Sequence, residues 1–195
     1  MAEVTALRAD RRGLVAIELD GEPWRTIPAD VVVGTGLAVG TVLERADFRR
    51  VRAALRRSEA LGRATAILAR RSVSAHALDE RLAAAGVAAA ERREAIATVR
   101  RAGYLNDERL ATARAATLAG RGAGDDAIRA DLELRGVGRA DVERALATLP
   151  PEAERARTIL AERGRTPAAA RALARKGFAA DTLDAFFEDS VAPDG

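Results

Sequence analysis

Few residues in this 195-residue chain could carry out acid–base, nucleophilic or metal chemistry. There is no Cys, and His76 is the one His, so the sequence offers neither a thiolate nor a His/Cys zinc site. The one Lys, Lys176, stands directly before Gly177 and outside any GxxxxGK[ST] phosphate-binding loop. The adjacent acids Asp79 and Glu80 lie near Arg at helical spacing, as ordinary surface ion pairs do. We therefore expect no catalytic site, no metal and no cofactor, with His76 on the surface.

A Gly-rich stretch invites comparison with dinucleotide-binding sites. The apolar run 31–33 is followed by Gly34, Gly36 and Gly40, which are spaced GxGxxxG rather than the required GxGxxG. No further strand–helix units follow, so we reject this function. The stretch instead predicts a short helix that Pro28 opens and Gly34 or Gly36 ends.

Positive charge is the stronger chemical feature. Charged residues make up 31% of the chain, the net charge is +3, and all the basic residues except one are Arg. Residues 49–71 carry eight Arg against the single acid Glu59. Guanidinium groups bind phosphate and carboxylate groups in bidentate fashion, so this segment is the first candidate for contact with an acidic partner. A solvated helix face, and an Arg bias that reflects base composition alone, are the competing explanations.

The N-terminal segment predicts a small β unit. Apolar and polar residues alternate over 3–9 and 14–19, and Asp20–Gly21 supplies a tight hairpin turn before a returning strand at 24–27. Three short strands cannot form a stable unit alone, so we expect them to pack on a helix. No apolar run is long enough to span a membrane, and the first 20 residues do not resemble a signal peptide. We expect a cytoplasmic protein.

Three segments become similar when Gly86, Gly136 and Gly177 are superimposed. Apolar or small residues precede each Gly by four and eight positions, an apolar residue follows at once, and another lies 18 positions before. The members of these sets are Leu82, Leu78, Val87 and Leu68; Leu132, Ile128, Val137 and Leu118; and Leu173, Ala169, Phe178 and Ile159. Ser74, Gly124 with Asp125 and Asp126, and Thr166 with Pro167 mark the starts of the three middle helices.

These patterns predict a mainly α protein, in which a small N-terminal β unit precedes a tandem array of three three-helix repeats. Because each repeat contacts mainly its neighbours, we expect the array to be elongated and curved. The expected segments are a β-rich unit at 1–45, a linker helix with the first repeat at 46–102, the second repeat at 103–149, the third at 150–190, and a frayed tail at 191–195.

The stretch Gly103 to Ala111 contains the only Tyr of the chain. Gly103 closes one helix, and Asn106 or Asp107 can cap the next. With Arg70–Ser74, Leu78, Leu82, Gly86, Val87, Gly122, Ile128, Leu132 and Arg135–Val137, this stretch makes residues 60–190 resemble the RecX family of RecA regulators. The resemblance extends weakly to the N-terminal β unit. This sequence departs from the family at Leu110, where Phe is usual, and at Asp125 and Asp126, where basic residues are common. Those acids argue against phosphate binding by this face of the second repeat.

The resemblance implies a non-enzymatic protein that binds along the groove of the RecA–DNA filament and inhibits strand exchange and ATP hydrolysis, within DNA repair and the SOS response. It implies the recombinase filament as partner, with single- or double-stranded DNA as a further one; we expect a monomer. A direct DNA-binding protein with helix-turn-helix-like units is the alternative. The expected partner-binding residues, at helix ends or turns, are Arg70, Arg71, Arg100, Arg101, Arg135, Arg139, Arg175 and Lys176. Tyr104, Asp107, Glu108 and Arg109 are expected to be structural, with Tyr104 packed at the joint between the first two repeats and its hydroxyl hydrogen-bonded.

Overall fold

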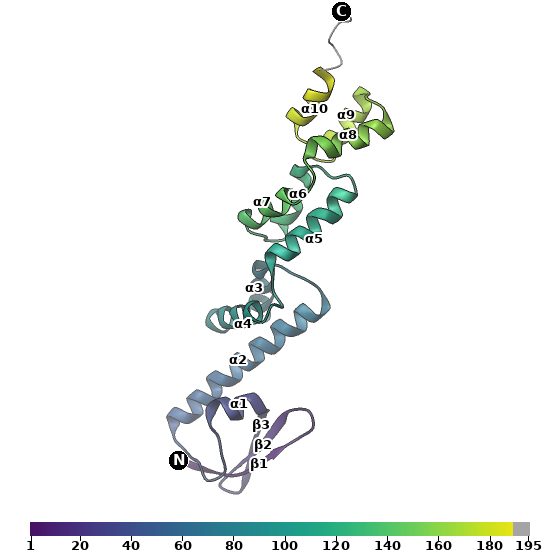
Figure 1. Cartoon of the computed structure of the whole chain (residues 1–195). Coiled ribbons are helices and arrows are strands. Elements are labelled where there is room, and N and C mark those ends of the chain that lie inside the picture. The colour runs from purple at the N-terminus through teal and green to yellow at the C-terminus, as the bar shows by residue number, and fades with distance from the viewer. Residues whose placement is uncertain (189–195) are drawn as a thin grey trace, which may run out of the picture. The chain divides into compact units, whose positions relative to one another are not determined.

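The alternating N-terminal residues form an antiparallel sheet in the computed structural model, which describes residues 1–188 (Figure 1). Strands β1 (Ala2–Ala9), β2 (Leu14–Leu19), β3 (Glu22–Pro28) and β4 (Val42–Leu43) pair in the order β3-β2-β1-β4. Asp20 and Gly21 both take positive φ, 51° and 82°, and make the predicted turn between β2 and β3. The two-residue β4 was not predicted, because it is too short to show an alternating pattern.

The sheet packs on two helices, as three or four short strands require. Helix α1 (Ala29–Thr35) follows Pro28 and ends at Gly36, which takes a left-handed conformation. Val4, Ile17 and Ile27 of the sheet are buried together with Val31 of α1 and Val51 of α2 (Arg45–Arg70). The predicted short helix between Pro28 and Gly36 is therefore confirmed.

The rest of the described chain is helical: α3 (Ala75–Ala84), α4 (Ala89–Arg101), α5 (Asp107–Gly120), α6 (Asp125–Leu134), α7 (Arg139–Ala147), α8 (Glu152–Arg163), α9 (Pro167–Arg175) and α10 (Ala180–Glu188). The chain is thus mainly α with a small N-terminal sheet. Its contacts separate two compact units, one of residues 1–70 with 79–104, the other of residues 71–78 with the chain from 105 onward. The boundary passes through α3.

Small apolar residues line the helical cores, as the Ala-rich composition predicts. Ala111, Ala115 and Ala145 are buried with Ile128 and Leu132 between α5, α6 and α7. Larger side chains fill the next core, which α8, α9 and α10 form; its buried members are Ala156, Leu160, Leu173, Phe178, Leu183 and Phe186. The predicted tail at 191–195 lies outside the described residues.

Candidate partner-binding surface

The eight predicted partner-binding cations lie at helix ends or next to them. Most lie at C-terminal ends, where unpaired backbone carbonyls attract positive charge. Arg70 ends α2, Arg100 and Arg101 end α4, Arg135 follows α6, Arg139 opens α7, Arg175 ends α9, and Arg71 and Lys176 directly follow α2 and α9. All are exposed except Lys176, which is half-buried.

These cations are divided between the two compact units, and within the first unit Arg70 lies apart from Arg100. Arg70, Arg100 and Arg101 belong to the first compact unit, and the other five belong to the second. In the first unit, two hollows lie between α2 and α4. Arg63, in the second half of α2, lines one of them with Ala85, which precedes α4; Ala54, in the first half of α2, lines the other with Thr98, which is late in α4. The two helices therefore run antiparallel, and Arg70 lies at the opposite end of this pair from Arg100.

Two of the eight cations are engaged inside the second unit. The Nε of Arg135 donates to the Asp131 carboxylate at 2.7 Å, and Arg114 donates to both oxygens of the same carboxylate at 2.9 and 2.7 Å. These two guanidinium groups, Arg114 first, hold the pKa of Asp131 well below its ordinary value. Lys176 donates from Nζ to the Arg121 carbonyl at 3.2 Å. Within residues 1–188 no ion pair engages the six other cations, which are Arg70, Arg71, Arg100, Arg101, Arg139 and Arg175.

The basic segment 49–71 is partly neutralised by acids that lie outside it. Arg56 donates to Glu91 of α4 at 2.9 Å, and this hydrogen bond lowers the pKa of Glu91. Arg57 lies 3.9 Å from Glu94, and Arg50 pairs with Asp47. The sequence window could not reveal the two α4 acids, because they approach α2 only when the helices pack.

The residues of the motif that follows α4 take only some of the roles predicted for them. Tyr104 is 69% exposed, so the prediction that it packs at a joint is wrong, and the neighbouring Leu105 is buried instead. Asn106 caps α5 by accepting from the Arg109 N–H at 2.8 Å. Asp107 accepts at 2.9 and 3.2 Å from the Ala75 N–H, so it caps α3 rather than its own helix. Glu108 and Arg109 are exposed on the first turn of α5.

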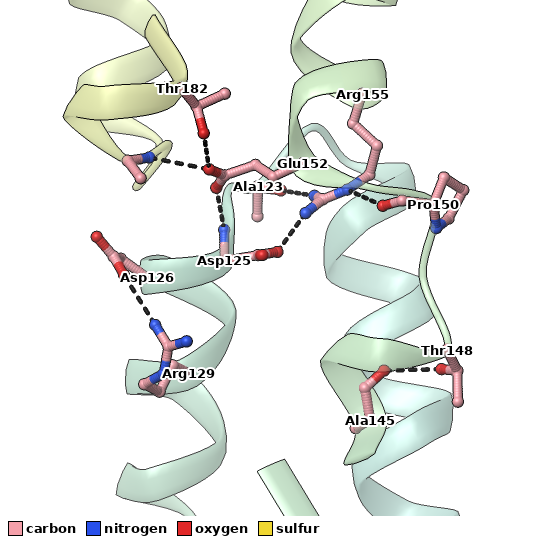
Figure 2. A network of polar contacts seen from close by, with 11 residues as sticks. Ala123, Asp125, Asp126, Arg129, Ala145, Thr148, Pro150, Glu152, Arg155 and Thr182 are labelled. Carbon is pink, nitrogen blue, oxygen red and sulfur yellow. Dashed lines mark hydrogen bonds and ion pairs between the residues drawn. The ribbon is translucent and has the colours of Figure 1, made fainter. Parts of the chain in front are cut away.

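A second carboxylate plays the same role further along the chain (Figure 2). Glu152, the first residue of α8, accepts from the N–H of Asp125, the first residue of α6, at 2.6 Å. Its other oxygen accepts from the Ala179 N–H at 3.2 Å and from the Thr182 hydroxyl at 2.9 Å, where α10 begins. One carboxylate thus satisfies N–H groups at the starts of two helices, which are otherwise unpaired.

Arg155 completes this network. Its guanidinium donates to the carbonyls of Ala123 at 2.7 Å and Pro150 at 3.1 Å and pairs with the Asp125 carboxylate. Burial raises the pKa of Asp125, and the attraction of Arg155 does not cancel that effect. Asp126 pairs with Arg129 at 2.8 Å. Both acids that depart from the family pattern are therefore held by Arg of the same unit.

Two junctions, one between α3 and α6 and the other between α6 and α9, are built alike. At the first, the Ser74 hydroxyl donates to the Arg135 carbonyl at 2.5 Å, so the start of α3 meets the end of α6. At the second, the N–H groups of Gly124 and Asp126 donate to the carbonyls of Lys176 and Gly177 at 2.8 and 3.1 Å, so the start of α6 meets the end of α9.

Glycine is required at both junctions. Gly136 and Gly177 take φ of 72° and 79°, a conformation that residues with a Cβ rarely adopt. A Cβ on Gly136 would lie 2.5 Å from the His76 ring, and one on Gly177 would lie 2.5 Å from the Ala127 nitrogen. The predicted surface residue His76 is indeed exposed, but it also abuts the end of α6.

Neither a membrane span nor a metal cluster is found where the structure describes the chain. No helix there is both long and apolar enough to cross a bilayer. No three His, Asp or Glu side chains in residues 1–188 gather as metal ligands would. The candidate partner-binding surface of residues 1–188 consists of exposed Arg side chains at helix ends.

Comparison with known proteins gives the fold. No family model matches the chain, and no curated protein sequence does. A crystal structure of the regulatory protein RecX matches with a TM-score of 0.81 at 20% identity, over 96% of this chain and all of that one. RecX from Lactobacillus salivarius matches with a TM-score of 0.59 at 17% identity, over 69% of this chain and 96% of that one. The chain therefore has the fold of the regulatory protein RecX.

Proposed function

We propose that this protein regulates a RecA recombinase by binding the RecA–DNA filament and inhibiting strand exchange and ATP hydrolysis. The observation that carries the proposal is the fold, since the match to a regulatory protein RecX extends over 96% of this chain. The resemblance of residues 60–190 to the RecX family, drawn from the sequence alone, supports the same conclusion. In this proposal the protein is a cytoplasmic monomer without catalytic activity that acts in DNA repair and the SOS response.

The proposed architecture is a small β-rich unit at 1–45 followed by a tandem array of three three-helix repeats. A linker helix and the first repeat occupy 46–102, and the other two repeats occupy 103–149 and 150–190. Two kinds of contact support it. Asp107, the first residue of α5, caps α3, and Glu152, the first residue of α8, caps α6. In each case the acid that begins one proposed repeat caps the middle helix of the preceding repeat. The middle helices α3 and α6 also each meet the end of the next middle helix through a glycine. An array of this kind, elongated and curved, suits a groove between filament subunits.

The proposed contacts are the exposed Arg at the helix ends. Arg70, Arg71, Arg100, Arg101, Arg139 and Arg175 have no ion pair within the described residues, so they are available to carboxylates on the recombinase or to DNA phosphates. Arg135 and Lys176 already hold parts of the second unit together, so their replacement would affect folding as well as binding.

The proposal is tested by ATP hydrolysis of purified RecA on single-stranded DNA with increasing amounts of this protein. We expect inhibition at substoichiometric amounts, and no inhibition at equimolar protein would refute the proposal. A parallel titration with DNA alone measures direct binding. Tight DNA binding that weakens steeply with salt, in a protein that leaves RecA unaffected, would favour the DNA-binding alternative, because phosphate contacts release counterions.

A further inference from the structure

The two junctions consist of a donor half and an acceptor half. The donor half is the first turn of a middle helix, α3 or α6, with its N–H groups and cap. The acceptor half has three parts: a glycine with positive φ at the end of the next middle helix, the carbonyl before that glycine, and an acid on the first helix of the same group. At the first junction these parts are Gly136, the Arg135 carbonyl and Asp107; at the second they are Gly177, the Lys176 carbonyl and Glu152.

A third acceptor half lies at the end of α3, within the first compact unit. Gly86 takes φ of 76°, close to the values at Gly136 and Gly177. A Cβ built on Gly86 meets nothing within 4 Å, whereas at the two occupied glycines it would meet the incoming helix. The acid of this third acceptor half, Glu59, lies within α2, whereas Asp107 and Glu152 begin their helices. Glu59 precedes Gly86 by 27 residues, compared with 29 from Asp107 to Gly136 and 25 from Glu152 to Gly177.

These parts line one hollow. Glu59, Arg63, Ala85 and Gly86 are among the residues around a cavity of about 200 Å³ between α2 and the turn that precedes α4. Glu59 is exposed, and no hydrogen bond or ion pair in residues 1–188 engages its carboxylate. The hollow therefore combines a free carboxylate with the carbonyl end of a helix. Both attract the positive, N–H-bearing end of another helix.

We propose that this hollow binds the first turn of a helix from another protein. The two occupied junctions indicate what the docking helix must provide. It needs a small or hydroxyl-bearing cap residue, followed by a residue whose backbone N–H is free to reach a carboxylate. In this chain Ser74 and Gly124 are the cap residues, and Ala75 and Asp125 provide those N–H groups.

The open middle helix of a second copy of the chain does not fit as the occupant. The starts of α3 and α6 are already used, which leaves α9 as the middle helix whose start is open. Helix α9 begins with Pro167, which has no N–H at the position that the acid must reach. Its cap, Thr166, is satisfied within the helix by the Ala169 N–H at 3.2 Å.

Arg63 competes with the incoming helix. Its Nη1 donates to the Ala85 carbonyl at 2.5 Å, which is the bond that the helix start makes at the two occupied junctions. The docking helix displaces this guanidinium, so removal of Arg63 should strengthen binding. Removal of the Glu59 carboxylate should weaken it. If the two substitutions change the affinity in opposite directions, the changes report on docking and not on a general loss of structure.

The test uses the full chain, labelled with ¹⁵N, and a helix-stabilised peptide with the sequence of residues 124–136, which carries the donor half of α6. We expect amide shifts confined to residues 59–63 and 85–88. A peptide with Pro in place of its second residue should produce none of them, because the required N–H is absent. Glu59→Lys should weaken binding about fivefold and Arg63→Ala should strengthen it, as expected for charges at helix ends.

Three results would overturn the inference: shifts at Gly177 instead of Gly86, equal binding of the Pro peptide, or the same change in affinity for both variants. Sedimentation of Arg63→Ala provides a further check, since self-association would identify a second copy as the occupant and refute the assignment to another protein. No recombinase is present in these experiments, so they are independent of the proposed function.

Discussion

The carboxylate of Glu152 accepts a hydrogen bond from the backbone N–H of Asp125, 27 residues earlier in the chain, at 2.6 Å. Through its second oxygen the same side chain holds the start of α10. The starts of α6 and α10 therefore both depend on one residue, which lies at the start of α8 (Figure 2).

Glu152→Ala is expected to lower the free energy of unfolding by about 2–3 kcal/mol, because it leaves N–H groups unpaired at two helix starts. Urea denaturation followed by circular dichroism measures the change. Glu154→Ala is the matched control: it removes an exposed acid from the same turn of α8 and should change stability by less than about 0.5 kcal/mol. Equal effects of the two substitutions would show that Glu152 is not a cap.

Gly136→Ala is expected to be more destabilising than Gly103→Ala. Both glycines follow a helix and have nearly the same φ, 72° and 76°, so both substitutions incur a backbone penalty of about 1 kcal/mol. Only at Gly136 does the added methyl group overlap another residue, His76, which should cost about 1–3 kcal/mol more. Thermal melts of the two variants compare them directly, and similar melting temperatures would contradict the close approach at the first junction.

Low pH should weaken the contact between α5 and α6. The folded-state pKa of Asp131 lies below its ordinary value because Arg114 and Arg135 stabilise the carboxylate, so its contribution is fully present above about pH 5 and is lost as the pH falls. Since the site is partly solvated, we expect about 1 kcal/mol at neutral pH.

Asp131→Asn should therefore be less stable than the wild type at pH 7, by a margin that shrinks between pH 5 and pH 2.5. Urea unfolding at a series of pH values measures that margin. Arg114→Gln should reduce it, since Arg114 is the main cause of the shift. A margin that does not vary with pH would contradict this assignment.

The proposed function gives a further prediction for Arg70 and Arg71. The double substitution of both residues by Glu should raise the concentration needed to inhibit RecA ATP hydrolysis by about tenfold, because it reverses the charge of an exposed contact surface. Arg163 and Arg165 are also exposed, so their double substitution by Glu is a control with the same change in net charge. Unchanged melting temperatures would exclude unfolding, and full inhibition by the Arg70 and Arg71 variant would show that the contact lies elsewhere.

Local signals were sufficient to predict several elements from the sequence. Thr166 and Pro167 begin α9, Ser74 caps α3 through the Ala77 N–H, and Asp20–Gly21 form the hairpin turn. In each case the residues that decide the conformation lie within four positions of each other. The mainly α fold with an N-terminal sheet follows from these signals and from the apolar spacing.

Contacts between distant segments could not be predicted in the same way. Asp107 was expected to fix its own helix, yet its partner is Ala75, 32 residues away. Glu152 is an acid in the first turn of α8, a common position for an acid, and its role appears only when α6 and α10 approach it. Tyr104 was expected to pack, but the buried position belongs to its neighbour Leu105. The sequence predicted that the surface Arg residues lie at helix ends, but it did not predict that they are divided between two compact units.

The bonds of the second junction run from the N–H groups of Gly124 and Asp126 to the carbonyls of Lys176 and Gly177, so they join backbone to backbone. Side chains outside the Glu152 and Arg155 network can vary around such a joint, provided that Gly124, Gly177 and the chain spacing are retained. An architecture joined in this way can diverge widely in sequence while its shape persists. The RecX fold of this chain, which a known structure matches with a TM-score of 0.81 at 20% identity, agrees with such tolerance.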